Sequence, residues 1–131
     1  MDSEKYNKIL IVEDESLIAK QLQILLQKSG YSVIGITENG REAVRLARTV
    51  APDGILMDVN ISGEMDGIET ALEIRKYVKT KILFISGYSD DFTKKRALET
   101  PFSAFITKPF TVKEFLDELK SLFENKAAQQ I

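Results

Sequence analysis

The sequence predicts an α/β fold in which five strands alternate with five helices to form one doubly wound parallel sheet. Two patterns predict this fold: five short apolar runs recur along the chain, and each is followed by a segment with helical spacing of apolar residues. Turn-forming residues mark the boundaries between the two kinds of segment. Such alternation places helices on both faces of a parallel sheet, with right-handed crossovers.

The strands are predicted from apolar runs that do not alternate with polar residues. Continuous runs of this length are typical of strands that are covered on both faces, as in parallel sheets. The fifth run is the weakest. The runs occupy residues 9–12, 33–36, 54–57, 82–85 and 104–106.

The helices are predicted from apolar stripes between these runs. Gly30 ends the first helix, Asn39 opens the second, and Thr111 is placed to cap the fifth. Residues 90–99 are expected to form the fourth helix, with a thin apolar face, and Lys94-Lys95-Arg96 to be a solvated part of it. The other stripes are Ile18, Leu22, Leu25 and Leu26; Ala43, Leu46, Ala47 and Val50; Ile68, Ala71, Leu72 and Val78; and Val112, Phe115, Leu116, Leu119 and Phe123.

The composition indicates one globular domain and excludes several kinds of chemistry. The chain has 131 residues, 44% hydrophobic and 29% charged, and its 18 basic and 20 acidic residues form no long runs, so binding to nucleic acid or membranes is not expected. Cysteine and histidine are absent, which excludes disulfides, thiolate or imidazole metal ligands, and histidine acid/base catalysis. No segment approaches the ~20 apolar residues of a membrane span. We expect a cytoplasmic protein.

Polar residues follow the predicted strands at the points where those strands end. Glu13 and Asp14 follow the first strand, Asp58 the third, Ser86 the fourth, and Lys108 comes just after the fifth. Ligands of open parallel sheets bind beyond the carboxyl ends of the strands. Taken singly, each residue has an ordinary explanation as a helix signal, a turn or a surface lysine. Their placement at the same end of the sheet favours a functional site.

The chemistry of this set favours a divalent cation and a phosphoryl group. Three carboxylates repel one another unless a cation intervenes, and carboxylate-rich sites suit magnesium. Together with Lys108, a divalent ion offsets their charge, and Asp58 is the candidate nucleophile for an aspartyl phosphate. The first turn, Glu13-Asp14-Glu15-Ser16, is not a glycine-rich phosphate loop, which disfavours a dinucleotide-binding fold.

Over residues 8–124 the chain resembles the receiver domains of two-component response regulators. The matching motifs are Ile9-Leu10-Ile11-Val12-Glu13-Asp14-Glu15, Met57-Asp58-Val59-Asn60, Met65-Asp66-Gly67, Ser86-Gly87 and Lys108-Pro109-Phe110. The resemblance implies a flavodoxin-like fold with strand order 2-1-3-4-5. It implies a receiver domain over residues 1–126, with residues 127–131 as a tail or linker stub.

The resemblance also implies the residues of a metal site. Glu13, Asp14 and Asp58 are expected to bind Mg²⁺ through their carboxylates, and Asn60 through its backbone carbonyl. Mn²⁺ and Ca²⁺ are expected substitutes. Asp58 is the expected phosphoacceptor.

Residues of the fourth and fifth strands are expected to respond to the phosphoryl group. Ser86 supplies the hydroxyl that turns toward it, Lys108 contacts it, and Phe105 is the switching aromatic, although an aromatic in an apolar strand is more often ordinary core. The Lys108-Pro109 bond is expected to be cis.

One feature near the expected acceptor departs from the family pattern, and two further positions affect the lifetime of the acyl phosphate in relatives. The loop after Asp58 lacks the usual proline and is one residue longer, with Ser62-Gly63 in its place, so altered geometry or mobility is expected there. In relatives, side chains at the positions of Asn60 and Tyr88 tune hydrolysis of the acyl phosphate.

The implied function is a phosphorylation switch rather than an enzyme. The expected donor is a sensor histidine kinase, a histidine phosphotransfer protein or a small acyl phosphate. The surface of the fourth helix, fifth strand and fifth helix is expected to change and to regulate a target in trans or a removed output domain, in a monomer or weak dimer. One alternative is a receiver-like interaction module without phosphorylation. Another is a haloacid dehalogenase-like hydrolase, for which Asp58-Val59-Asn60 lacks a second aspartate.

Overall fold

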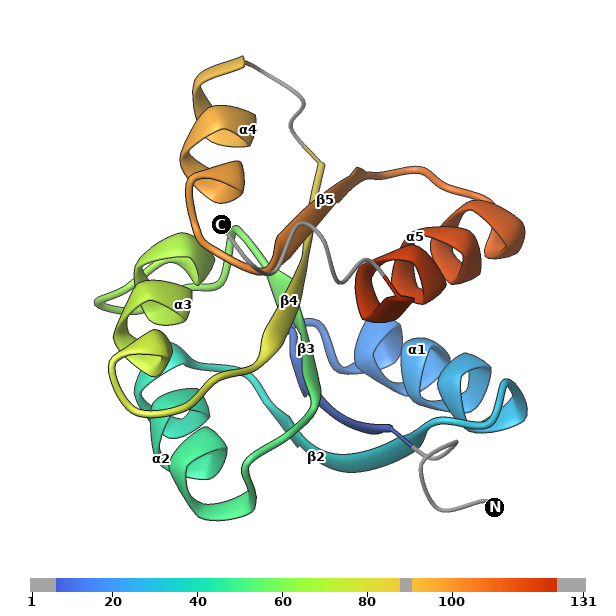
Figure 1. Cartoon of the computed structure of the whole chain (residues 1–131), viewed down its shortest axis with the longest axis horizontal. Coiled ribbons are helices and arrows are strands. Elements are labelled where there is room, and N and C mark those ends of the chain that lie inside the picture. Colours follow the sequence, from blue (N-terminus) through green and yellow to red (C-terminus); the bar gives the residue numbers. More distant parts are fainter. Residues whose placement is uncertain (1–6, 88–90, 125–131) are drawn as a thin grey trace.

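The computed structural model describes residues 7–87 and 91–124, in which five strands and five helices alternate (Figure 1). The strands form one parallel sheet in the order β2-β1-β3-β4-β5, which confirms the predicted architecture. The elements are β1 (Lys8–Val12), α1 (Ser16–Lys28), β2 (Ser32–Thr37), α2 (Gly40–Val50), β3 (Gly54–Asp58), α3 (Gly67–Arg75), β4 (Lys81–Ser86), α4 (Asp91–Leu98), β5 (Ser103–Thr107) and α5 (Val112–Glu124).

The central strands are apolar throughout because both of their faces are covered. All five residues of β3 are buried, as are all but the first residue of β1 and of β4. Alternate residues of one strand enter opposite cores. Leu10 of β1, for example, packs beneath α2 and α3, whereas Ile11 packs beneath α1 and α5.

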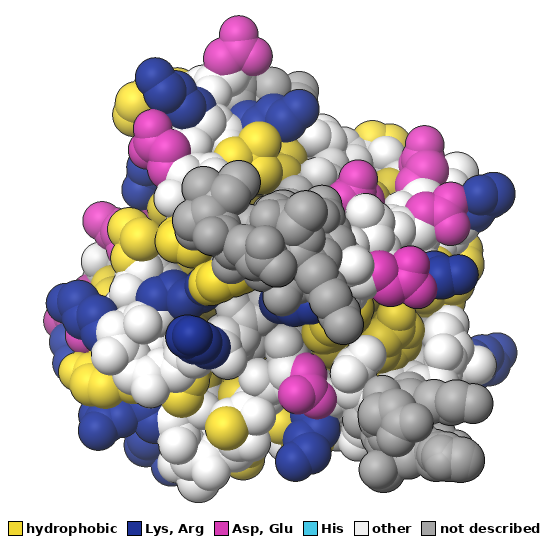
Figure 2. Space-filling model, viewed as in Figure 1, with side chains coloured by type: hydrophobic (Ala, Val, Ile, Leu, Met, Phe, Trp, Pro, Cys, Tyr) yellow, Lys and Arg dark blue, Asp and Glu magenta, His cyan; other side chains and the backbone are white. Residues whose placement is uncertain are grey.

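The helices form two unequal layers. Helices α1 and α5 cover one face of the sheet, and α2, α3 and α4 cover the other (Figure 1). Charged side chains of both signs are dispersed over the face seen in Figure 2 rather than gathered in a single patch. No described helix has both the length and the apolar character needed to cross a membrane.

Helix ends follow the predicted turn chemistry. The Asn39 side chain accepts a hydrogen bond at the start of α2, and Gly30 after α1 has a positive φ of 94°. Thr111 and Glu114 form reciprocal hydrogen bonds at the start of α5, of 2.8 and 3.0 Å. The sequence therefore places these boundaries correctly.

Two residues of the predicted apolar stripes are exposed rather than buried, and helix α3 ends before the last residue of its predicted stripe. Leu72 is 50% exposed because the side of α3 that faces the core carries Ile68, Ala71 and Ile74, and Leu72 lies at the margin of that side. Val112 is 57% exposed at the first turn of α5, before the helix meets the core. Val78 packs against the core from beyond the end of α3.

Candidate functional site

The ends of β1 and β3 bring three carboxylates together. Val12, the last residue of β1, is paired with Met57, so Glu13 and Asp14 emerge beside Asp58. Carboxylate oxygens of these three acids all lie within 4.8 Å of one another. The parallel register therefore assembles the acidic group expected from the sequence.

Glu13 is the most strongly perturbed of these acids. It is only 3% exposed, and its Oε1 atom has no hydrogen-bond partner among the described residues, while Oε2 accepts from the Glu15 amide at 3.2 Å. Burial, followed by the neighbouring Asp58, raises the pKa of Glu13 to about 7, against the opposing influence of Lys108. A buried carboxylate oxygen without a donor beside two further carboxylates is the arrangement that a hard divalent cation fits.

The backbone fixes Asp58 tightly at the end of β3. Its side chain is 6% exposed, and Oδ1 accepts a hydrogen bond from the Asn60 amide at 3.0 Å. A contact of this kind stabilises a turn, and by itself it would explain an aspartate at this position without any catalytic role. The next residue, Val59, donates to the Ile85 carbonyl at 2.9 Å and accepts from the Gly67 amide at 2.8 Å. The backbone next to Asp58 is thus held from β4 and from the start of α3.

Ser86 is the last residue of β4 and Lys108 directly follows β5, so both lie at the carboxyl ends of the strands. Ser86 is fully buried, and its carbonyl accepts a hydrogen bond from the Lys108 amide at 2.8 Å. Lys108 is half-buried and acts on the pKa of Glu13, so its charge is felt within the acidic group. The Lys108-Pro109 peptide bond is cis.

The longer loop after Asp58 is fastened to the site by its backbone. The Ser62 amide donates to Asp14 Oδ2 at 3.2 Å, and the following Gly63 has a positive φ of 114°. Glu64 forms an ion pair with Arg41 on α2. Sequence reasoning did not find the contact from Ser62, because any residue offers an amide and only the loop's path aims it. Tyr88 lies outside the described residues.

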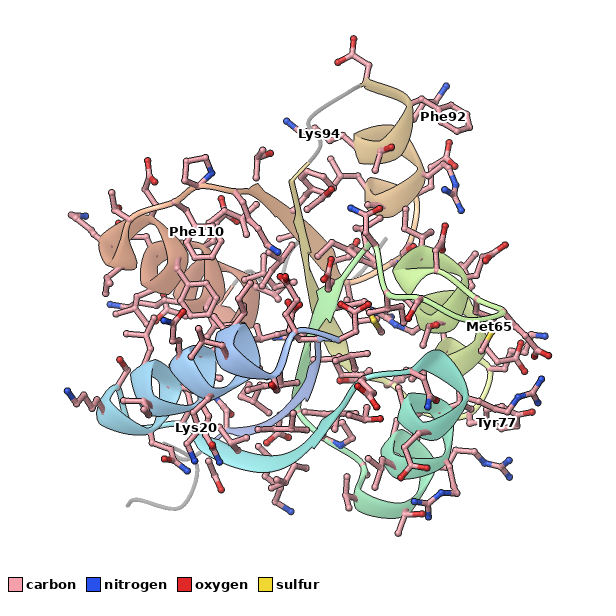
Figure 3. The ribbon with its side chains drawn as sticks, turned by 180° about the vertical axis from the view of Figure 1, so that it is seen from behind. Lys20, Met65, Tyr77, Phe92, Lys94 and Phe110 are labelled. Carbon is pink, nitrogen blue, oxygen red and sulfur yellow. The ribbon has the colours of Figure 1, made fainter. Side chains whose placement is uncertain are left out.

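Phe105 occupies the middle of β5, opposite Phe84, and packs half-buried against the core beneath α2, α3 and α4. It also lines a cavity of about 600 Å³ between β5 and α5, together with Pro109, Phe110 and acidic residues of α5. Phe110 stacks on Phe115 at a ring-centroid distance of 5.5 Å, and Figure 3 shows it beside α5. Phe105 therefore lies between the core and a concave surface.

Comparison with known families assigns this fold, with its acidic group at the carboxyl ends of the strands, to a class of signalling domain. The family model of the response regulator receiver domain matches residues 9–120. The chain belongs to this family. Receiver domains are regulatory phosphoacceptors that interact with histidine kinases and output domains, and they bind Mg²⁺ at an acidic pocket.

Similar curated proteins are transcriptional regulators. The chain is 33% identical over 113 residues to PdtaR of Mycobacterium tuberculosis, with 86% of the chain and 55% of PdtaR covered. It is 36% identical over 116 residues to the Bacillus subtilis regulator of alkaline phosphatase synthesis, PhoP, with 88% and 48% covered. The chain thus spans about half the length of these relatives.

Solved structures match nearly the whole chain. The signal receiver domain of a modulated diguanylate cyclase from Desulfovibrio desulfuricans superposes with a TM-score of 0.82 at 35% identity, covering 93% of this chain and 97% of that one. The CheX-CheY-BeF3-Mg complex from Borrelia burgdorferi gives a TM-score of 0.83 at 26% identity, with 89% of each chain covered.

Proposed function

We propose that Asp58 accepts a phosphoryl group in a Mg²⁺-dependent reaction and that the chain works as a signalling switch. The observation that carries this proposal is the group of Glu13, Asp14 and Asp58, whose oxygens lie within 4.8 Å of one another. Within the part of the chain that the structure describes, one buried Glu13 oxygen of this group has no hydrogen-bond partner. Such a group needs a cation, and Lys108 adds a further positive charge beside it. The site then has what phosphoryl transfer requires: a positioned carboxylate and cations near it.

In the proposed step, a carboxylate oxygen of Asp58 attacks phosphorus. A P–O bond forms while the donor's P–N bond in phosphohistidine, or P–O bond in a small acyl phosphate, breaks, and the bonding electrons leave with the donor. Glu13, Asp14, Asp58 and the Asn60 carbonyl would hold a Mg²⁺ ion, which would offset the negative charge of the phosphoryl oxygens when bound. Lys108 and the Ser86 hydroxyl contact the remaining phosphoryl oxygens.

Support for this step comes from the related CheY complex, which was solved with BeF3 and Mg²⁺. Beryllium trifluoride resembles a phosphoryl group in charge and shape, so it reports on the same kind of site. The phosphodonor is a sensor histidine kinase or a histidine phosphotransfer protein, or else a small acyl phosphate. Such donors place the switch in the cytoplasm, and no direct contact with nucleic acid or membrane is needed.

The proposed output is a change on the surface formed by α4, β5 and α5. Phosphorylation replaces one carboxylate charge by about two, which draws Ser86 inward and turns Phe105 toward the space it leaves. This surface then regulates a target in trans or an output domain of a longer protein. The chain acts as a monomer or weak dimer.

Mass spectrometry after incubation with acetyl phosphate or phosphoramidate and Mg²⁺ tests the proposal. We expect one stable phosphoryl group on the wild type and none on Asp58→Asn, while EDTA prevents the addition. Asp117→Asn is the matched control, because Asp117 is an exposed aspartate on α5, and it should be phosphorylated normally. No adduct on the wild type indicates an interaction module, and sustained multiple turnover of the donor indicates a hydrolase.

A further inference from the structure

Helix α4 is held in place by few apolar contacts. Ala97 is its one buried residue within Asp91–Leu98, and Figure 3 shows Phe92 and Lys94 directed away from the body of the protein. Its C-terminal end is tied to β5 through the Ser103 hydroxyl, which donates to the Ala97 carbonyl at 3.1 Å. Polar contacts therefore have an unusually large share in deciding where α4 lies.

One of these contacts joins α4 to the loop that follows the acceptor. Both terminal guanidinium nitrogens of Arg96 lie 3.4 Å from Asp66 Oδ2, and each side chain is only 34% exposed. The Arg96 guanidinium also lies 5.9 Å from the centre of the Phe92 ring. Lys94 and Lys95 are exposed, as predicted for a solvated face, whereas Arg96 is partly buried and spans from α4 to the N-cap of α3.

The position of Asp66 is coupled to the backbone of Asp58 and Val59, because the residue after Asp66 packs directly against that backbone. The next residue, Gly67, leaves no spare room, because a Cβ atom there would lie 2.2 Å from the Asp58 carbonyl oxygen. The Gly67 amide donates to the Val59 carbonyl at 2.8 Å. A displacement of the backbone at Asp58 or Val59 therefore moves Asp66, and the contact to Arg96 must follow or break.

We propose that the Asp66–Arg96 ion pair is a latch that holds α4 in its unphosphorylated position and thereby opposes phosphorylation of Asp58. The inference rests on the proposed function. Asp58 is 6% exposed, and the loop that begins at Val59 carries Asp66, so we expect an added phosphoryl group to shift this loop. Because the pair stabilises only the unmodified arrangement, its loss favours the phosphorylated one. By linkage, whatever releases the latch tightens binding of a phosphoryl mimic.

The variants Arg96→Gln and Asp66→Asn test the latch, since asparagine keeps the N-cap acceptor of α3 while removing the charge. Lys76→Gln is the control, because it removes another ion pair of α3 that lies away from α4. Beryllium trifluoride affinity with Mg²⁺ is measured by calorimetry, and amide exchange of residues 91–98 is followed without ligand. Unfolding curves establish that each variant is folded.

We expect both variants to bind beryllium trifluoride about twofold to fivefold more tightly than the wild type, with faster exchange in α4, and the control to match the wild type. The double variant should equal the single ones, because one pair can be broken only once. Unchanged or weaker binding, or additive effects in the double variant, overturns the latch but leaves the proposed function standing. Failure of the wild type itself to bind the mimic overturns both.

Discussion

Helices α5 and α4 lie next to β5 and are fixed there in different ways. The 13 residues of α5 bury Phe115, Leu119 and Leu122, and a capping box marks the start of the helix. The 8 residues of α4 bury Ala97 alone, and an ion pair and a hydroxyl contact are among the polar contacts that hold the helix. Helix α5, on one side of β5, is therefore firmly packed, whereas α4, on the other side, is held by fewer apolar contacts and is easier to displace.

This difference bears on how a switch is built into a small domain. Elements that move are drawn from the less stable parts of a protein, where few apolar contacts have to be broken. Burial of large apolar side chains costs several kcal/mol to undo, whereas a half-exposed ion pair is worth about 1 kcal/mol or less. If Asp58 is modified as we propose, α4 is the element beside β5 that we expect to shift more readily than α5.

The largest effect expected from this comparison is on stability. Phe115→Ala in α5 should lower the free energy of unfolding by about 3–5 kcal/mol, because it empties a fully buried aromatic site. Phe92→Ala in α4 should change it by less than about 0.5 kcal/mol, because that ring is 72% exposed. Urea denaturation measures both values. Similar losses of stability in the two variants would contradict the conclusion that α5 is more firmly packed than α4.

A substitution at the start of α3 should break the connection between the acceptor and α4. Gly67→Ala places a Cβ against the Asp58 carbonyl, so we expect a loss of about 2–3 kcal/mol in the free energy of unfolding and a reduced extent of phosphorylation. Gly87→Ala is the matched control for stability, because no atom of the described residues lies within 4 Å of a Cβ added there. Unfolding curves and the phosphorylation assay read both effects. Equal behaviour of the two variants would show that the close approach at Gly67 is not needed.

The arrangement of the acidic group was predictable because a repeated pattern specifies it. Continuous apolar runs predict parallel strands, and parallel strands bring their carboxyl ends to one edge, which places Glu13, Asp14 and Asp58 together. The strand order itself came from the family resemblance and is confirmed. The roles of these side chains stay predictions.

Other features were hidden because no local pattern records them. The ion pair between Asp66 and Arg96 joins positions 30 residues apart, and Ser62 acts through an amide that every non-proline residue has. Leu72 shares the helical spacing of its neighbours and is nevertheless exposed, because tertiary packing selects which side of a short helix faces the sheet. Sequence periodicity predicts elements more reliably than it predicts contacts between loops.

The acidic group lies at the ends of β1 and β3, away from the edge strand β5, and it should make the stability of the fold depend on pH. Burial and Asp58 raise the pKa of Glu13 from its ordinary 4.5 to about 7, so the folded chain retains a proton that the unfolded chain releases. Without metal, the free energy of unfolding should therefore fall as the pH rises from 4.5 to 7. Glu13→Gln removes this dependence and should be more stable than the wild type at alkaline pH by about 1–2 kcal/mol.

Denaturation at several pH values in EDTA measures this difference, and added Mg²⁺ should reduce it by stabilising the wild type. The variant Glu118→Gln, on α5 and away from the acidic group, is the control and should follow the wild type. A wild-type curve that rises between pH 5 and 7 would mean that Glu13 is stabilised in its charged form without any metal. The burial argument for a cation at this position would then be lost.

A smaller effect on stability is expected from the cap of α5, which contributes less than the buried side chains of that helix. Thr111→Ala removes the hydroxyl that accepts from the Glu114 amide at 3.0 Å, and should lower the free energy of unfolding by about 1 kcal/mol. Thr111→Ser keeps the acceptor and should stay close to the wild type. Because α5 is anchored mainly by Phe115, Leu119 and Leu122, neither variant should alter affinity for beryllium trifluoride. A change in that affinity on loss of the cap would mean that the start of α5 moves with the switch, and the contrast with α4 would fail.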